Sequence, residues 1–363
     1  MASDRSSSRL SLQIHRLGFF LFLFVFATLF MFPGSASAVK IRNGADPTVI
    51  KVGNNYYSAE SAEGGGIFVR EASTLEGLGA NDVKRQRVWV AGPGVVDIWA
   101  PDMSMYQNRT YIHFSAGRDA AHRMYVISAD SPLGQYSNET QLALPDNQWA
   151  IDGTFFVFEG QAWFVWSGWE SETRNTEQTL YICRMESPSK PMGRRFVISQ
   201  PREPWEQGDH PLINESPQAI VDPSGQLHIV YSANGSWGSR YCLADLRLRE
   251  GGDSTNVWDW YKSNGCLFGS HQDRMMKGWD ATLFIDGPGH HTFALPEGSV
   301  EKSPGGGNHI PFVFHGVQKG TPYSWENRAW FTGSFVWWGS TTYSRANVPG
   351  DERNTGYSFK FFE

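Results

Sequence analysis

Three observations in the sequence predict an all-β protein built as a single five-bladed β-propeller. Short stretches rich in Val, Ile, Tyr, Phe and Trp recur after about residue 40, separated by turn dipeptides such as Gly53-Asn54 and Glu159-Gly160. Helical periodicity is almost absent over the same span. A recognisable segment also returns about every fifty to sixty-five residues, which is the length that a four-stranded propeller blade requires.

The first four copies of this segment share one layout. Each opens with a short apolar stretch, passes a polar turn and continues into an aromatic-rich stretch that ends on Ser. From the opening position, here called the slot, to the closing Ser is fifteen residues in the first three copies and seventeen in the fourth, where the turn is longer. This alignment places Asp46, Ala100, Asp152 and Glu215 in the slot, and the closing residues are Ser61, Ser115, Ser167 and Ser232.

A fifth, less regular copy begins at Gly287 and resumes after a Gly-rich loop at Ile310. Five repeats predict five blades in one domain, residues 39–363, with no interdomain linker. A double-sheet sandwich is the alternative, but it would not explain a slot that recurs at blade-sized spacing.

The N-terminal segment has the order of a secretory signal. Basic residues up to Arg16 precede an apolar stretch at 17–32, and Ala36-Ser37-Ala38 then offers small residues for cleavage. A membrane anchor is the alternative, but the apolar stretch is shorter than the roughly 20 residues that cross a bilayer. We therefore expect residues 1–38 to be a signal peptide and the mature chain to be secreted.

The cysteines and the glycosylation patterns fit an extracellular protein. Cys242 and Cys266 flank one polar stretch and can form a disulfide, which leaves Cys183 over. Asn-X-Ser/Thr patterns suited to surface turns begin at three asparagines, Asn108, Asn138 and Asn234. A fourth pattern begins at Asn214, where a glycan would block the slot, so we expect that site to be unmodified.

Charge and aromatic content narrow the class of partner. A formal net charge of −6 without any Lys/Arg-rich run argues against nucleic acid or an anionic membrane as the partner. Aromatic residues make up 14% of the chain, with 15 Trp, and such rings serve both β-sheet cores and sugar-binding surfaces. Trp99 precedes a slot, and Trp169 and Trp237 follow closing serines, so these three are candidate sugar platforms.

Three of the four slots hold an acid. Each acid alone has a simpler explanation, as a turn residue or a solvated loop residue. If the slot opens the innermost strand of each blade, however, Asp46, Asp152 and Glu215 converge at one mouth of the central channel. Their shared register therefore predicts a polyacidic active site.

The motifs of the sequence together resemble those of a known family. Its motifs are similar, in order and spacing, to those of glycoside hydrolase family 43, and most of all to those of its exo-acting α-L-arabinofuranosidases, from about Asn43 to about Phe314. The resemblance is carried by Ala45-Asp46-Pro47, Trp99-Ala100-Pro101-Asp102, Ile151-Asp152-Gly153-Thr154, Asn214-Glu215-Ser216-Pro217 and Gly287-Pro288-Gly289-His290.

The resemblance implies an inverting mechanism with Asp46 as general base, Glu215 as general acid and Asp152 as the carboxylate that tunes and orients the acid. Inversion needs the acid and base on opposite sides of the scissile bond, with the carboxyls roughly 6.5–9.5 Å apart. A neighbouring Asp152 carboxylate would keep Glu215 protonated by like-charge repulsion.

The resemblance also implies an ion, often calcium, in the channel near a His of the fifth blade, which His290 matches. The alternative is a His that is merely hydrogen-bonded there, and we expect no cofactor to be required. The chain departs from the family pattern at Ser216, where many relatives have Gly. The Arg that relatives use to hold substrate is not evident, and Arg328 or Arg345 can replace it.

The sequence thus predicts a secreted, monomeric glycoside hydrolase that releases terminal α-L-arabinofuranose from arabinan, arabinoxylan or a related plant cell-wall polysaccharide. A β-xylosidase or an endo-arabinanase of the same fold is the enzymatic alternative. A carbohydrate-binding propeller without catalysis is the alternative of another class, and it would tolerate the loss of one acid.

Overall fold

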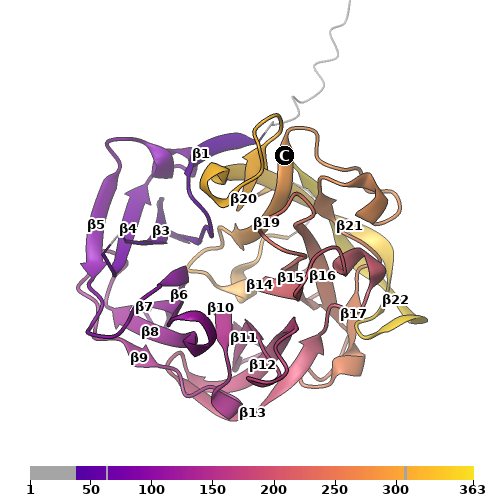
Figure 1. Cartoon of the computed structure of the whole chain (residues 1–363), viewed down its shortest axis with the longest axis horizontal. Helices are drawn as coiled ribbons and strands as arrows, with labels where there is room; N and C mark the ends of the chain where they lie inside the picture. The colour runs from indigo at the N-terminus through magenta and orange to yellow at the C-terminus, as the bar shows by residue number, and fades with distance from the viewer. Residues whose placement is uncertain (1–37, 63, 306–308) are drawn as a thin grey trace, which may run out of the picture. The chain divides into compact units, whose positions relative to one another are not determined.

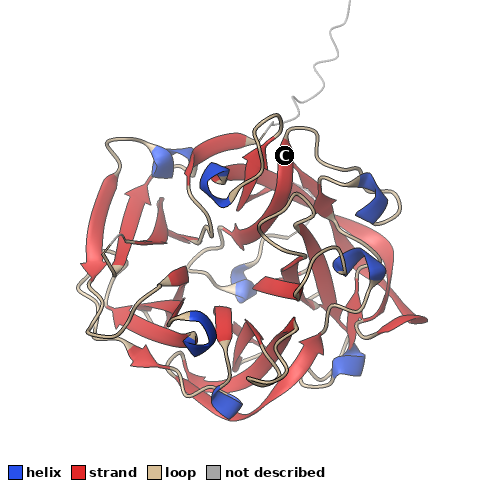
Figure 2. Ribbon diagram, viewed as in Figure 1, coloured by secondary structure: helices blue, strands red, loops and turns tan. Residues whose placement is uncertain are grey.

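A computed structural model describes residues 38–62, 64–305 and 309–363. The expected signal peptide, apart from Ala38, lies outside the described residues. Within the described part, every helix is a single 3-10 turn and none could span a bilayer, while strands run through the whole of it (Figure 2), which confirms the all-β prediction. The 3-10 turns are η1 Glu76–Gly79, η2 Asp119–Ala121, η3 Pro145–Asn147, η4 Pro204–Glu206, η5 Val257–Asp259, η6 Gln272–Arg274, η7 Val300–Lys302 and η8 Trp325–Asn327.

Two separate four-stranded antiparallel sheets come first along the chain. One has the order β2-β3-β4-β5, formed by Val49–Val52, Asn55–Ser61, Ile67–Ala72 and Lys84–Trp89. The other has the order β6-β7-β8-β9, formed by Trp99–Tyr106, Arg109–Ala116, Arg123–Ala129 and Thr140–Gln141.

The remaining strands form one fourteen-stranded sheet made of successive antiparallel meanders. The first is β10 to β13, formed by Ala150–Phe158, Gln161–Gly168, Glu177–Ser187 and Lys190–Ser199. The second is β14 to β17 with the short β18, formed by Leu212–Val221, Leu227–Ala233, Cys242–Leu248, Trp260–Lys262 and Phe268–Gly269. The last is β19 to β22 with β1, formed by Ile285–Phe293, Ile310–Gln318, Ala329–Arg345, Val348–Phe362 and Val39–Asn43. Short pairings of β12 with β14 and of β17 with β21 join the three.

Inner and outer strands of the meanders differ in burial, and the difference explains their sequences. All residues of β15 and β16 are buried, so both faces of these strands are covered. Apolar residues predominate, and the buried His228, Asp245 and Arg247 each have a hydrogen-bond partner. By contrast, β5 is mostly exposed, β13 is exposed or half-buried over most of its length, and both carry Lys and Arg residues, which protect sheet edges. Figure 1 shows β6, β10, β14 and β19 facing a common centre, with β5, β9 and β13 outermost.

The slot marks a bulge at the start of the first strand of each repeat. The ladder slips there in β6, β10, β14 and β19. One residue at each slip, and one before β2, has a positive φ: Asp46 (54°), Ala100 (43°), Asp152 (55°), Ser216 (52°) and His290 (41°). Because none of them is Gly, each is held in a conformation that costs about 1 kcal/mol or more.

This pattern corrects the predicted register of the fourth copy. Glu215 pairs with Ser232 just as Ile151 pairs with Ser167, so it stands one position before the slot, and Ser216 occupies the slot. The prediction was wrong because it placed Glu215 in line with the acids Asp46 and Asp152. The slot is instead the position at the bulge with a positive φ, which in this copy is Ser216.

Polar residues two positions after four of the five slots line a cavity shared by the first strands. Its lining includes Asp102, Thr154, Gln218 and Thr292, from four different strands. Asp102 accepts hydrogen bonds from Thr48 Oγ1 (3.3 Å) and Gln218 Nε2 (3.0 Å), and burial raises its pKa to about 6. The first strands therefore meet around one polar interior.

Two local predictions are confirmed. Glu159-Gly160 forms a tight turn between β10 and β11, with Phe158 paired to Gln161. Cys242 and Cys266 form a disulfide, and Cys183 is free and buried.

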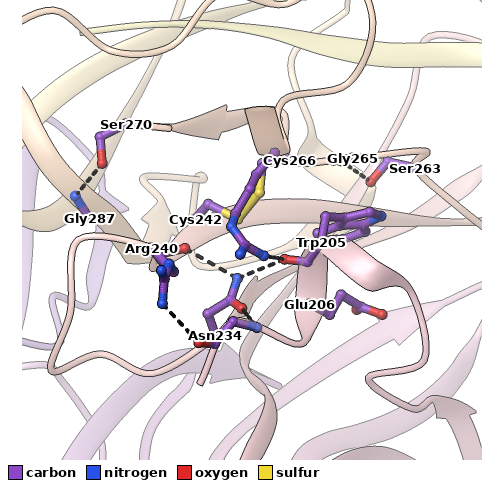
Figure 3. Close-up of a disulfide and its surroundings, with 12 residues drawn as sticks. Trp205, Glu206, Asn234, Arg240, Cys242, Ser263, Gly265, Cys266, Ser270 and Gly287 are labelled. Carbon is purple, nitrogen blue, oxygen red and sulfur yellow. Dashed lines mark hydrogen bonds between the residues drawn. A yellow bond between two sulfur atoms is a disulfide. The ribbon is translucent and has the colours of Figure 1, made fainter. Parts of the chain in front are cut away.

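The predicted glycosylation sites divide into exposed and buried ones. Asn108 and Asn138 are exposed, as expected of surface turns. Asn234 is buried instead, close to the disulfide (Figure 3), and its amide donates to the carbonyl oxygens of Trp205 and Arg240. The expectation of a surface turn at Asn234 was wrong because this amide satisfies the backbone of two neighbouring loops.

Candidate active site

Asp46 is held between β20, β21 and the first sheet. Its backbone N–H donates to Nδ1 of His315 (3.0 Å), and Trp330 Nε1 donates to the carbonyl oxygen of Ala45 (2.8 Å). Its carboxylate lies 3.2 Å from Nδ1 of His290 and 3.9 Å from Nη1 of Arg328. Burial alone would raise the pKa of Asp46, but these neighbours together hold it well below its usual value. The group is therefore ionised, as a base must be.

Asp152 is more deeply buried, with its side chain 6% exposed. Its Oδ2 accepts hydrogen bonds from Ser216, through the backbone N–H (3.2 Å) and the hydroxyl (2.9 Å). Burial, and then the charge of Asp46, raise the pKa of Asp152, while His290 and the Ser216 bonds oppose the shift. Two neighbouring carboxyl groups thus have pKa values shifted in opposite directions.

Glu215 is buried, and its Oε1 accepts a hydrogen bond from the Tyr241 hydroxyl (2.8 Å). Burial is the main cause that raises its pKa well above the usual value, and the negative charge of Asp152 is the second. Gly289 makes room for this arrangement, because a Cβ at that position would collide with the Tyr241 ring. Glu215 is therefore a carboxylic acid that keeps its proton.

Sequence reasoning missed three residues that connect these acids. Ser216 Oγ lies 2.7 Å from Nδ1 of His290 and 3.3 Å from the Tyr241 hydroxyl, and His315 anchors the backbone of Asp46. The slot alignment would have indicated Ser216 had the fourth copy been shifted by one residue. No local pattern marks Tyr241 or His315.

A buried polar network supports the strand that carries Glu215. The Asn214 side chain donates to Glu206 Oε1 (2.8 Å) and accepts from the Ser199 hydroxyl (2.7 Å). Glu206 also pairs with Lys262 at 2.9 Å, and both side chains are essentially inaccessible. The Asn214 amide is therefore occupied by hydrogen bonds in the folded chain, and the absence of a glycan at this site stays a prediction.

The three candidate Trp platforms lie at the strand ends that hold the acids. Trp99 is 44% exposed and stacks on His122, with ring centroids 3.7 Å apart. Trp169 follows β11 and stacks on Trp149, with centroids 4.6 Å apart. Trp237 is 42% exposed in the loop after β15. Trp99 and Trp237 therefore present an aromatic surface to solvent, whereas Trp169 is half-buried.

Arg328 stands beside Asp46, whereas Arg345 does not share its surroundings. Arg328 approaches Asp46, and its guanidinium lies over the exposed ring of Trp325, 5.7 Å from the centroid. Arg345 lies instead at the end of β21, over the ring of Trp258. Of the two arginines considered from the sequence, only Arg328 is therefore placed beside a candidate catalytic group.

Comparison with known proteins decides the family. The family model of glycosyl hydrolases family 43 matches residues 37–338. The chain belongs to this family. An extracellular exo-α-(1→5)-L-arabinofuranosidase of Streptomyces avermitilis is 31% identical over 264 residues, covering 70% of this chain and 52% of that protein. Alpha-L-arabinofuranosidase 43 of Humicola insolens is 27% identical over 261 residues, with the same two coverages. The chain thus spans about half the length of these relatives.

Solved structures share the fold of this family 43 chain. The α-L-arabinofuranosidase of Lactobacillus brevis superposes with a TM-score of 0.69 at 23% identity, covering 85% of this chain and 95% of that one. A thermostable family 43 glycoside hydrolase superposes with a TM-score of 0.63 at 21% identity, covering 88% and 98%.

One group of side chains in this family 43 chain has the make-up of a metal site. Asp46, His290 and His315 offer donor atoms within 4.8 Å of one another. Burial lowers the pKa of His315 to about 4, so its ring is neutral, and its Nδ1 already accepts the Asp46 N–H. His290 Nδ1 is engaged by Ser216. Ca²⁺ prefers six to eight oxygen ligands, and this group offers one carboxylate and two imidazoles, so these side chains by themselves do not make up a calcium site.

Proposed function

We propose that this protein is a secreted, monomeric glycoside hydrolase that releases terminal α-L-arabinofuranose from arabinan or a related plant cell-wall polysaccharide. The observation that carries the proposal is the opposite tuning of two carboxyl groups in one site. Asp46 is held ionised, whereas Glu215 is held protonated by burial and by Asp152. Such a pair is what acid and base catalysis of glycoside hydrolysis requires.

In the proposed mechanism, Asp46 takes a proton from a water molecule that attacks the anomeric carbon. Glu215 gives its proton to the leaving oxygen, and the configuration inverts because the water enters from the face opposite the bond that breaks. Asp152 stays ionised, orients Glu215 and keeps its pKa high. Arg328 and the Trp99 ring hold the sugar, and Trp169 and Trp237 contact the remainder of the polymer.

We further propose that the meanders are the five blades of a β-propeller. The blades begin at β2, β6, β10, β14 and β19, and the contact of these first strands around one polar cavity supports the assignment. The large sheet is then three neighbouring blades joined by the short pairings of β12 with β14 and of β17 with β21.

Secretion is supported by the disulfide and by the word extracellular in the names of two Streptomyces relatives. Cleavage after Ala38 would leave β1 intact, since that strand begins at Val39. N-terminal sequencing of protein recovered from the medium should therefore give Val39 first. A full-length chain retained in the membrane would contradict both the cleavage site and secretion.

A channel Ca²⁺ beside His290 stays a prediction, and no catalytic step is derived through it. The nitrogen that His290 directs at Asp46 is already bonded to Ser216, so an ion there would be held mainly through water. Calorimetry of protein dialysed against EDTA, with and without added Ca²⁺, tests the prediction. An unchanged Tm would contradict the prediction of a bound Ca²⁺.

A product assay tests the function itself. Linear arabinan, aryl α-L-arabinofuranoside and aryl β-xyloside are each incubated with the protein, and the anomer first released is read by proton NMR. We expect arabinose, released first as the β-anomer, from the first two substrates. Xylose release would favour a β-xylosidase and arabino-oligosaccharides an endo-arabinanase. Binding of sugar without hydrolysis would favour the non-catalytic propeller.

A further inference from the structure

Ser216 has a backbone conformation that is energetically unfavourable for a residue other than Gly. Its φ is 52°, in the region that favours Gly, and it is only 3% exposed. A Gly there would relieve the backbone but would remove the hydroxyl. That hydroxyl lies within hydrogen-bond distance of three different side chains, those of Asp152, His290 and Tyr241.

The hydrogens at this junction can be assigned one by one. The Tyr241 hydroxyl donates to Glu215, so its hydrogen is not directed at Ser216. Ser216 has a single hydrogen and donates it to the Asp152 carboxylate, which can only accept. The remaining short contact, 2.7 Å to His290 Nδ1, is then a bond in which the serine oxygen accepts. His290 must therefore carry a hydrogen on Nδ1.

The same N–H faces the predicted base. His290 Nδ1 lies 3.2 Å from Asp46 Oδ1, so a hydrogen on this nitrogen is attracted to the Asp46 carboxylate, whereas a lone pair would repel it. The presence of a hydrogen on His290 Nδ1 thus decides whether the carboxylate of the predicted base is attracted or repelled.

We propose that Ser216 is a positioning residue whose oxygen holds the hydrogen on His290 Nδ1 and thereby couples Asp152, on the acid side, to Asp46, on the base side. This role rests on the proposed function. Without the hydroxyl, His290 loses the acceptor of its Nδ1 hydrogen, and Asp152 loses one of its two hydrogen bonds to Ser216. Both carboxylates then lose their orientation, and a displacement of about 1 Å costs roughly a hundredfold in rate.

The structural alternative is that Ser216 is only a small residue that the slot tolerates. Three variants separate the two. Ser216→Gly removes the strain and the hydroxyl, and Ser216→Ala removes the hydroxyl alone. Ala100→Gly is the matched control, because it relieves a positive φ of 43° in the slot of another strand where no hydroxyl exists.

We expect Ser216→Gly to have an equal or higher Tm and a kcat about tenfold to a hundredfold lower, with KM for the aryl arabinofuranoside changed less than about twofold. Ser216→Ala should lose as much kcat without the gain in Tm. Ala100→Gly should gain Tm and keep its kcat. Wild-type kcat in Ser216→Gly would overturn the inference.

A second measurement does not depend on activity. In protein labelled with ¹⁵N-histidine, with the His290 signals assigned by their loss in His290→Gln, Nδ1 of His290 should be protonated in the wild type and change in Ser216→Gly. An Nδ1 signal that is the same in both proteins would overturn the inference even if the rate falls. A wild-type protein that hydrolyses no glycoside would instead overturn the proposed function, and the ¹⁵N spectra would still decide the tautomer.

Discussion

At the scale of single residues, the candidate site separates an ionised carboxyl group from a protonated one by their surroundings. Asp46 has two histidines and Arg328 within 4 Å of its carboxylate. Glu215 is buried beside Tyr241 and faces the charge of Asp152. The chemistry of a carboxyl group is thus set by its neighbours rather than by residue type.

Replacement of the proposed acid and replacement of the proposed base should reduce activity in different ways. Glu215→Ala should lose far more activity on arabinan oligomers than on an aryl arabinofuranoside with an acidic phenol, because a good leaving group needs no protonation. Asp46→Ala should lose at least about a hundredfold on both substrates, because each needs an activated water. Steady-state rates on the two substrates measure the difference, and equal residual rates for Glu215→Ala would refute the acid assignment.

Asp152→Asn should move the alkaline limb of the rate profile to lower pH. The charge of Asp152 raises the pKa of Glu215, so its removal lets Glu215 lose its proton earlier, while burial still holds this pKa above the usual value. The pH dependence of kcat/KM measures the shift. Asp102→Asn is the matched control, since Asp102 lies two positions from the slot of another strand, and it should leave the alkaline limb in place. An unmoved limb in Asp152→Asn would contradict the tuning role.

At the scale of elements, β14 is held from behind by a buried ion pair. Lys262 of β17 and Glu206 of η4 meet at 2.9 Å, and Glu206 also accepts from Asn214 and from the Tyr231 hydroxyl. η4, β15 and β17 therefore together fix the strand that carries Glu215. Removing one partner of such a buried pair is strongly destabilising, because the remaining charge is neither paired nor solvated.

Lys262→Met should lower the free energy of unfolding by about 3–5 kcal/mol, because it leaves the Glu206 charge buried without its partner. Denaturant unfolding monitored by Trp fluorescence measures the loss. Lys190→Met, which breaks an exposed pair with Glu186, is the control and should change stability by less than about 1 kcal/mol. Similar losses of unfolding free energy in both variants would show that the buried pair contributes no more to stability than the exposed one.

At the scale of the whole described chain, its two ends complete the last meander together. β1 pairs with β21 from Val39 to Asn43, and β22 takes over the same edge from Ser334 of β21 onward. Arg42 of β1 also covers the fully buried Trp330, 4.9 Å from the ring centroid. The N-terminal strand is therefore part of the sheet that anchors Asp46 through Trp330.

A chain that begins at Gly44 should be less stable than one that begins at Val39. Without β1, the backbone of β21 at 329–332 keeps β20 but loses its partner on the other edge, and the Trp330 ring loses the Arg42 side chain. We therefore expect a Tm lower by at least about 5 °C and reduced activity. Calorimetry of the two chains measures the difference. Equal Tm values would mean that β22 alone closes the sheet.

Much of the fold and most of the site could be predicted from local signals in the sequence. Short strands, turn dipeptides and blade-sized spacing indicated the all-β class, and the strand pairing confirms it. The recurring acids pointed to Asp46, Asp152 and Glu215, and the structure connects all three through Ser216, His290 and Tyr241. These features follow from backbone periodicity and from residue type, both of which can be read from the local sequence.

The sequence by itself therefore determined the class of fold, the family and which acids belong together. Only the tertiary structure decided that Glu215 stands one position outside the slot, that Tyr241 and His315 reach the acids, and that Asn234 is buried. These features depend on contacts between residues far apart in the chain. Tyr241 reaches Glu215 because Gly289, from another strand, leaves space for its ring, and no local pattern can express such a contact.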